Sequence, residues 1–141
     1  WEPNPDPQDG KLKLGVQITP LYEIMNSYRK MNSHCYLRSV VCDSKKFSTF
    51  NLSQIHDVVY QKPYDICPMD WVEAFLQKDL HPQKTARFWC SALVGYIYTK
   101  CGILEKDTDW TIMRPSDFSL DGEKLSFQKG CSLSNVQTRI F

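Results

Sequence analysis

Cys90 stands where a side chain could act as a nucleophile, in the first turn of a predicted helix and directly after Phe88 and Trp89. The positive end of a helix dipole and the free backbone N–H groups there favour the thiolate form of a cysteine. The same N–H groups can hold the oxyanion that forms during acyl transfer. The position fits a second interpretation equally well, in which Cys90 only begins the buried face of the helix.

The helix that would carry Cys90 is predicted from Phe88 to Gly102, where glycine can end it with a positive φ angle. Apolar residues recur in it at i, i+3, i+4, i+7 and i+11, which predicts one continuous buried stripe. The stripe consists of Cys90, Leu93, Val94, Ile97 and Cys101.

Three histidines are present as candidate bases for such a thiol. His34 begins a predicted strand, His56 lies in a predicted helix, and His81 lies in the segment that leads to Cys90. Each histidine also fits a surface position or one with satisfied hydrogen bonds.

The six cysteines suggest neither a disulfide framework nor a metal site. No two of them form a C-x-x-C pair, and a chain with a real apolar core does not need bridges. Mostly free thiols and a reducing compartment are therefore favoured. The set of His34, Cys35, Cys42 and Cys67 fits no zinc signature, so neither a metal nor an organic cofactor is expected.

Aromatic residues make up 13% of the chain, and several could line an acyl-binding pocket. The same residues also fit a core or the wall of a groove. They are Trp71, Phe75, Phe88, Trp89, Tyr96 and Tyr98.

The remaining segments supply the elements that must position these side chains. Apolar and polar residues alternate over 12–18, and strands are also predicted over 34–42 and 135–141. Helices are predicted over 20–30, with Thr19 as cap and Pro20 as first residue, from Asn51 to before Pro63, and over 70–78. Asp121 and Gly122 predict the turn of a hairpin.

Length and composition limit the function classes. The chain has 141 residues and 42% hydrophobic residues, enough for a single domain with its own core. Its net charge of +1 argues against binding nucleic acid through bulk positive charge. The longest apolar stretch, residues 90–98, is too short to span a bilayer. Separate helices and strands without βαβ regularity predict an α+β fold.

Three segments together resemble one family. They are residues 88–94 (FWCSALV), residues 102–104 (GIL) and residues 114–118 (RPSDF). Their order and spacing resemble the circularly permuted papain-fold cysteine hydrolases, the YiiX-like branch of the NlpC superfamily. Residues 16–21 and 36–38 also resemble the central region of that family. The resemblance implies a nucleophile helix that begins at Cys90 and packs on an antiparallel sheet.

The resemblance also implies where the other catalytic groups stand. The family carries its histidine on a strand that precedes everything present here, followed by a strand with a polar residue that orients it. Trp1 and Glu2 resemble the end of that second strand, so Glu2 would be the orienting carboxylate. Of the three histidines in this chain, His34 is the reserve base, because in papain-like enzymes the base lies on a strand beside the nucleophile helix. Residues 1–141 would then be the larger, C-terminal part of a permuted papain-like domain. One departure is Ala92, which stands where the family usually has glutamate.

These observations lead to two expected functions. The first is a thiol hydrolase or acyltransferase that cleaves an amide or ester bond in a peptide, peptidoglycan or a lipid through Cys90. The alternative is a papain-like scaffold without catalysis, acting as a structural or interaction component of a larger assembly such as a virion. Ala92 and the missing histidine favour the alternative, and a chain of this extent alone is expected to be inactive.

Overall fold

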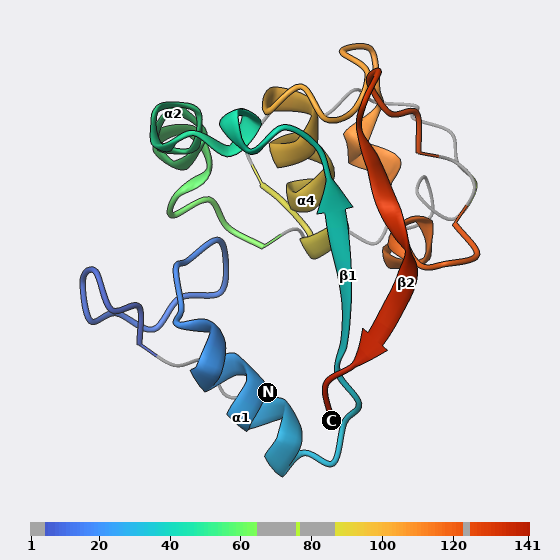
Figure 1. Ribbon diagram of the computed structural model, residues 1–141. Coiled ribbons are helices and arrows are strands. Elements are labelled where there is room, and N and C mark those ends of the chain that lie inside the picture. The colour runs from blue at the N-terminus through green and yellow to red at the C-terminus, as the bar shows by residue number, and fades with distance from the viewer. Residues whose placement is uncertain (1–4, 65–75, 77–86, 123–124) are drawn as a thin grey trace.

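The computed structural model describes residues 5–64, 76, 87–122 and 125–141, and it combines helices with a small sheet (Figure 1). This confirms the predicted α+β class. The described elements, in chain order, are α1 (Leu21–Lys30), β1 (Tyr36–Val41), η1 (Ser44–Phe47), α2 (Thr49–Val59), α4 (Cys90–Lys100), η2 (Trp110–Ile112), η3 (Pro115–Phe118) and β2 (Ser132–Arg139).

Strands β1 and β2 form a two-stranded antiparallel sheet, in which Tyr36 faces Arg139 at one end and Val41 faces Ser132 at the other. Between Arg38 and Val40 the register shifts, so that three residues of β2, 134–136, stand opposite one residue of β1. Such a bulge releases backbone groups from the ladder. Strands predicted over 34–42 and 135–141 are confirmed, although β2 begins earlier and ends at Arg139.

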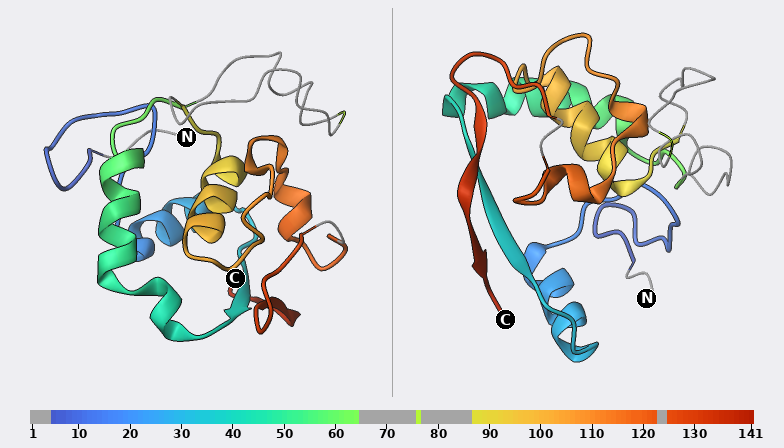
Figure 2. Two further views of the ribbon diagram at one scale, coloured as in Figure 1. Left: turned by 90° about the horizontal axis from the view of Figure 1, so that it is seen from above. Right: turned by 90° about the vertical axis from the view of Figure 1, so that its right-hand side faces the viewer.

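Helix α4 lies between α2 and the segment that contains η2 and η3 (Figure 2). A cluster of buried residues forms the core beside this helix. It consists of Ile55, Val59, Phe88, Tyr96, Cys101, Ile103 and Cys131. The sheet passes beside α4 and extends toward α1, which lies apart from α2 and α4 in Figure 1 and in the right-hand view of Figure 2. The core therefore surrounds the helix that carries Cys90.

Helix α4 runs from Cys90 to Lys100, so it begins two residues after the predicted start, and Gly102 follows it with a φ angle of +66°. The predicted buried stripe is wrong in part, because the buried residues of α4 are Ser91, Ala92, Gly95 and Tyr96. Neighbours on several sides cover this helix, and its partly buried Leu93 and Ile97 pack against the core cluster. Periodicity alone could not separate the faces of a helix that is covered in this way.

Helix α2 begins at Thr49, two residues before the predicted cap at Asn51. The Ser48 hydroxyl caps it by accepting from the Asn51 backbone N–H at 3.3 Å. The Asn51 side chain instead donates to the Lys46 carbonyl at 3.1 Å. Helix α1 also starts one residue later than predicted, with Pro20 as cap.

The strand predicted over 12–18 is absent, since only an isolated bridge joins Gly15 to Pro63. Leu12 and Leu14, which should have faced a core, are 66% and 62% exposed. The partner segment contains Pro63, which has no N–H to extend a ladder. The predicted turn at Asp121 and Gly122 exists, but beyond it Phe127 forms a bridge with Leu104, and the described residues there contain no hairpin.

A buried charge cluster holds the N-terminal segment against the end of α2. Asp6 is fully buried, and its carboxylate accepts from Lys13 Nζ at 2.9 Å and from the Tyr60 hydroxyl at 3.0 Å. Lys13 also pairs with Asp9 at 2.9 Å. Burial works against ionisation of Asp6, but the hydrogen bonds from Lys13, the Gln8 N–H and Tyr60 outweigh it and lower the pKa of Asp6.

Acid should therefore open this N-terminal segment. Because the pKa of Asp6 is lower in the folded chain, its contribution to stability is present above about pH 3.9 and disappears as the pH falls through the folded pKa. Hydrogen exchange of the Asp6 and Gly10 amides should rise in that window. Asp6→Asn should show the faster exchange already at pH 7 and lose the acid step. Asp107→Asn, an exposed control, should keep the step; if Asp6→Asn also keeps it, another group causes the opening.

No helix among the described residues has both the length and the apolar character needed to cross a bilayer. Several predictions fall outside those residues: the helix over 70–78, the residues Glu2, Cys67, Trp71 and Phe75, and His81.

Candidate functional site

A pocket of about 360 Å³ opens beside the first turn of α4. Its walls come from β1, β2, α4 and the η3 segment, which are far apart in the sequence. The lining residues are Tyr36, Arg38, Cys90, Ser91, Val94, Tyr98, Pro115, Phe118 and Leu133.

Cys90 is the first residue of α4 and is exposed. The preceding residue, Trp89, has extended backbone angles, and no side chain caps the helix. Within the described part of the chain, the backbone N–H groups of Cys90, Ser91 and Ala92 have no hydrogen-bond partner. The thiol therefore borders both a pocket and unpaired N–H donors.

Packing on the opposite side holds the start of α4 in place. Phe88 is buried, and its N–H donates to the Pro63 carbonyl at 3.2 Å. Its ring centroid lies 5.4 Å from that of Tyr96 and 5.6 Å from that of Trp110. The Ser91 hydroxyl donates to the Met113 carbonyl at 2.6 Å. These contacts orient the first turn so that Cys90 faces outward.

The absence of a side chain at Gly95 allows this packing. A Cβ atom at Gly95 would collide with Met113 Sδ and would lie 3.0 Å from Trp110 Cβ. Helix α4 can therefore approach η2 closely, and Met113 comes within reach of Ser91.

Another wall of the pocket comes from the sheet. Arg38 Nε donates to the Ser134 carbonyl at 2.7 Å, in the bulge of β2. Its Nη1 donates to the Phe118 carbonyl at 3.0 Å and to the Ser119 carbonyl. Arg38 thus ties β1 to β2 and to the end of η3.

The third wall is η3 and the neighbouring aromatic rings. The Asp117 carboxylate accepts from the Arg114 N–H at 2.8 Å, which stabilises the turn that presents Pro115 and Phe118. The rings of Phe118 and Tyr98 meet edge to face with centroids 6.1 Å apart. Burial raises the pKa of Tyr98, with a further contribution from Cys42, so its phenol stays neutral.

No histidine or carboxylate is found among the described residues that line this pocket. His34 lies two residues before β1, and its Nδ1 is 2.7 Å from Arg139 Nη2. His56 stacks on Tyr60 and approaches Asp57. The described residues therefore bring neither histidine to Cys90, and Glu2 and His81 lie outside them.

The five described cysteines are unpaired, and they differ in exposure. Cys101 and Cys131 are buried, and Cys42 packs against the same core cluster. Burial raises the pKa of both Cys42 and Cys101. Cys90 is thus the exposed thiol of the described set.

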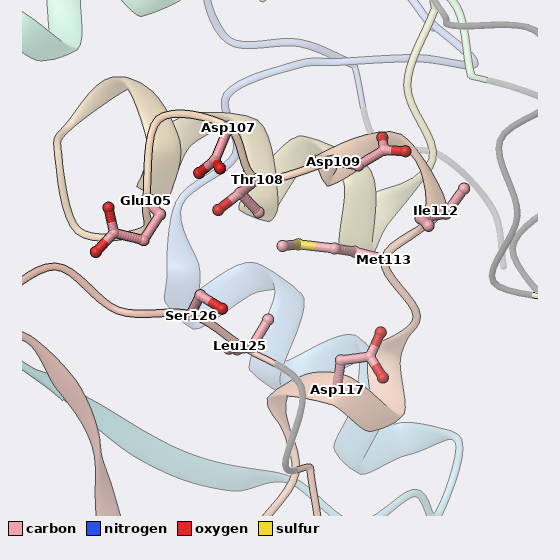
Figure 3. A pocket seen from close by; sticks show the side chains of 9 residues that line it. All are labelled: Glu105, Asp107, Thr108, Asp109, Ile112, Met113, Asp117, Leu125 and Ser126. Atoms are coloured by element: carbon pink, nitrogen blue, oxygen red, sulfur yellow. The ribbon is translucent and has the colours of Figure 1, made fainter.

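A second pocket, also of about 360 Å³, is lined by four carboxylates (Figure 3). Three of them already accept internal hydrogen bonds: Asp109 from Thr111, Asp117 from Arg114, and Glu105 from Gln128. Within the described ranges, no group of three or more His, Cys, Asp or Glu side chains is placed to hold a metal ion. Asp109 and Asp117 thus stabilise local turns, and Glu105 joins two segments that are far apart in the sequence.

Sequence reasoning found part of this site. Cys90 and the segment 114–118 both belong to the family resemblance, and Cys90, Pro115 and Phe118 line the same pocket. Among the aromatic candidates, Tyr98 lines it, whereas Phe88 and Tyr96 belong to the core. Arg38 and Leu133 were not anticipated as site residues, because only the bulged sheet brings them to the helix.

No protein-family model matches the chain, and comparisons with curated proteins and with solved structures found no significant match.

Proposed function

We propose that this chain supplies the nucleophile and the oxyanion-binding turn of a thiol hydrolase or acyltransferase of the permuted papain-like type. One observation carries the proposal: Cys90 is exposed at the uncapped start of α4 and lines a pocket of about 360 Å³. A thiol in that position can reach a bound carbonyl carbon, and the N–H groups beside it can reach the carbonyl oxygen.

In the proposed reaction, Cys90 Sγ attacks the carbonyl carbon of an amide or ester. The negative charge that develops on the oxygen is held by N–H groups of the first turn of α4. The C–N or C–O bond breaks, and the departing amine or alcohol takes up a proton. Water or another acceptor then attacks the thioester, which releases the acyl group and restores the thiol. The substrate would be a peptide, peptidoglycan or a lipid, and the steps need no metal or organic cofactor.

The base in this proposal is a histidine from outside the described residues, as the resemblance implies, and Glu2 orients it. The pocket itself offers no alternative base among its lining residues. His34, the reserve base, would have to leave Arg139 and move toward Cys90.

A scaffold without catalysis is the second candidate, and two observations favour it. The pocket lining contains no base. Helix α1 has no buried residue, although Leu21 and Tyr28 give it an apolar side. In this case the chain would act as a papain-like component of a larger assembly, such as a virion.

Labelling by iodoacetamide at pH 6 tests the first candidate. Cys90 should react roughly tenfold faster than Cys35, and faster still than the buried Cys101, because it is exposed at a helix start. Peptide mass spectrometry gives the rate at each site. Equal rates at Cys90 and Cys35 would favour the scaffold.

A further inference from the structure

Among the described residues that line the Cys90 pocket, Arg38 is the only charged one. The rest of the lining is aromatic, aliphatic or neutral, with Tyr36, Tyr98 and Phe118 as its rings. An anion that entered this pocket would therefore meet the guanidinium of Arg38.

The hydrogen bonds of Arg38 orient its guanidinium without neutralising it. All three of its acceptors are main-chain carbonyls, those of Ser134, Phe118 and Ser119. No carboxylate of the described residues pairs with it, and Nη2 donates to none of their atoms. A guanidinium has five N–H donors, so at least two remain available.

An arginine held in this way suits a carboxylate. A charged N–H group forms a short, strong hydrogen bond with a carboxylate oxygen, and the interaction strengthens where neighbouring side chains exclude water. Because Nε and Nη1 are already engaged with main-chain carbonyls, the N–H groups of Nη2 are the ones free to donate to a carboxylate oxygen. The neighbouring Tyr36, Tyr98 and Phe118 would contact an apolar group attached to that carboxylate.

We propose that Arg38 binds a free carboxylate of the substrate and thereby selects acyl compounds that carry both a carboxylate and an apolar group, such as the carboxy-terminal end of a peptide. This inference rests on the proposed function, since it places the reacting carbonyl at Cys90. A neutral lipid amide or ester would leave Arg38 without its partner.

Two alkylating reagents of almost equal size separate charge recognition from thiol reactivity. Iodoacetate and iodoacetamide both react by forming an S–C bond to Cys90 and releasing iodide, with the thiol proton passing to solvent. Only iodoacetate carries the carboxylate. The ratio of the iodoacetate rate to the iodoacetamide rate at Cys90 should exceed the ratio at Cys35 by roughly tenfold, because Arg38 attracts the anion.

Arg38→Gln should lower the Cys90 ratio by roughly tenfold, to the value at Cys35, whereas Arg38→Lys should retain most of it. Lys129→Gln removes an exposed cation and is the matched control, which should not change the ratio. Thermal melts confirm that each variant is folded. If Arg38→Gln and the unchanged chain give the same ratio, the inference is overturned.

Equilibrium binding keeps this inference distinct from the proposed function. Ligand-observed NMR should detect binding of 3-phenylpropionate to the Cys90→Ala variant, and 3-phenylpropionamide should bind that variant roughly tenfold more weakly. Adding Arg38→Gln should remove the preference for the carboxylate. If both reagents label Cys90 slowly but the carboxylate ligand binds selectively, the role of Cys90 as nucleophile is rejected and the role of Arg38 in carboxylate binding is retained. Fast labelling with no preference for the carboxylate would reject Arg38 and keep the nucleophile.

Discussion

Replacing Cys90 with serine should abolish the acetylation of this protein by p-nitrophenyl acetate. This ester has a good leaving group, so a thiolate can attack it without help from a general acid. The unchanged chain should release nitrophenolate and gain one acetyl group on the peptide that contains Cys90. Because the pocket lining contains no base, the thioester should persist, and turnover should be slow.

Serine at position 90 keeps the size of the side chain but is a far weaker nucleophile at neutral pH, so the rate should fall on the order of a hundredfold or more. Cys35→Ser is the matched control, because Cys35 is a free cysteine outside the pocket. It should acetylate at the rate of the unchanged chain. Acetylation spread evenly over several cysteines or lysines would contradict a special role for Cys90.

Replacing Ile103 with alanine should destabilise the fold by about 2–5 kcal/mol. Ile103 has no exposed surface and belongs to the core cluster directly after α4. Its backbone is also fixed, since its N–H donates to the Tyr98 carbonyl at 2.8 Å and its carbonyl accepts from Gln128 at 2.9 Å. The cavity left by the smaller side chain therefore cannot easily close. Urea denaturation followed by tryptophan fluorescence measures the loss.

Ile103→Val removes a single methylene group and should cost only about 0.5–1.5 kcal/mol, which makes it the graded control. Both variants should still label at Cys90 under native conditions, since Ile103 does not line the pocket. A loss below 1 kcal/mol for the alanine variant, within the range expected for valine, would show that the core around Ile103 is less tightly packed than described.

Local sequence signals predicted most of the elements that the structure describes. Helix α4 and its glycine stop follow from backbone chemistry, since glycine adopts the positive φ angle at little cost. Strands β1 and β2 follow from their apolar and β-branched residues. The strand predicted over 12–18 failed because a strand needs a neighbouring strand. Apolar and polar residues alternate there as in a strand, but the facing segment contains Pro63, which has no N–H to extend a ladder.

Whether Cys90 is buried or exposed could not be predicted from its position in the helix. Its spacing matched the apolar stripe, yet the structure buries Ser91 and Ala92 and leaves Cys90 exposed. The difference arises from tertiary contacts, because the hydroxyl of Ser91 reaches Met113 and Gly95 lets η2 approach that face. The elements that pack against α4 therefore decide which of its faces is buried.

The sequence by itself determined that a cysteine begins a helix, because this depends on neighbouring residues. Only the tertiary structure decided that Cys90, Arg38 and residues of segment 114–118 line the same pocket. Arg38 lies 52 residues before Cys90, and its position depends on the bulge in β2, which begins a further 44 residues along. Such a juxtaposition depends on strand register and helix packing, which no local pattern encodes.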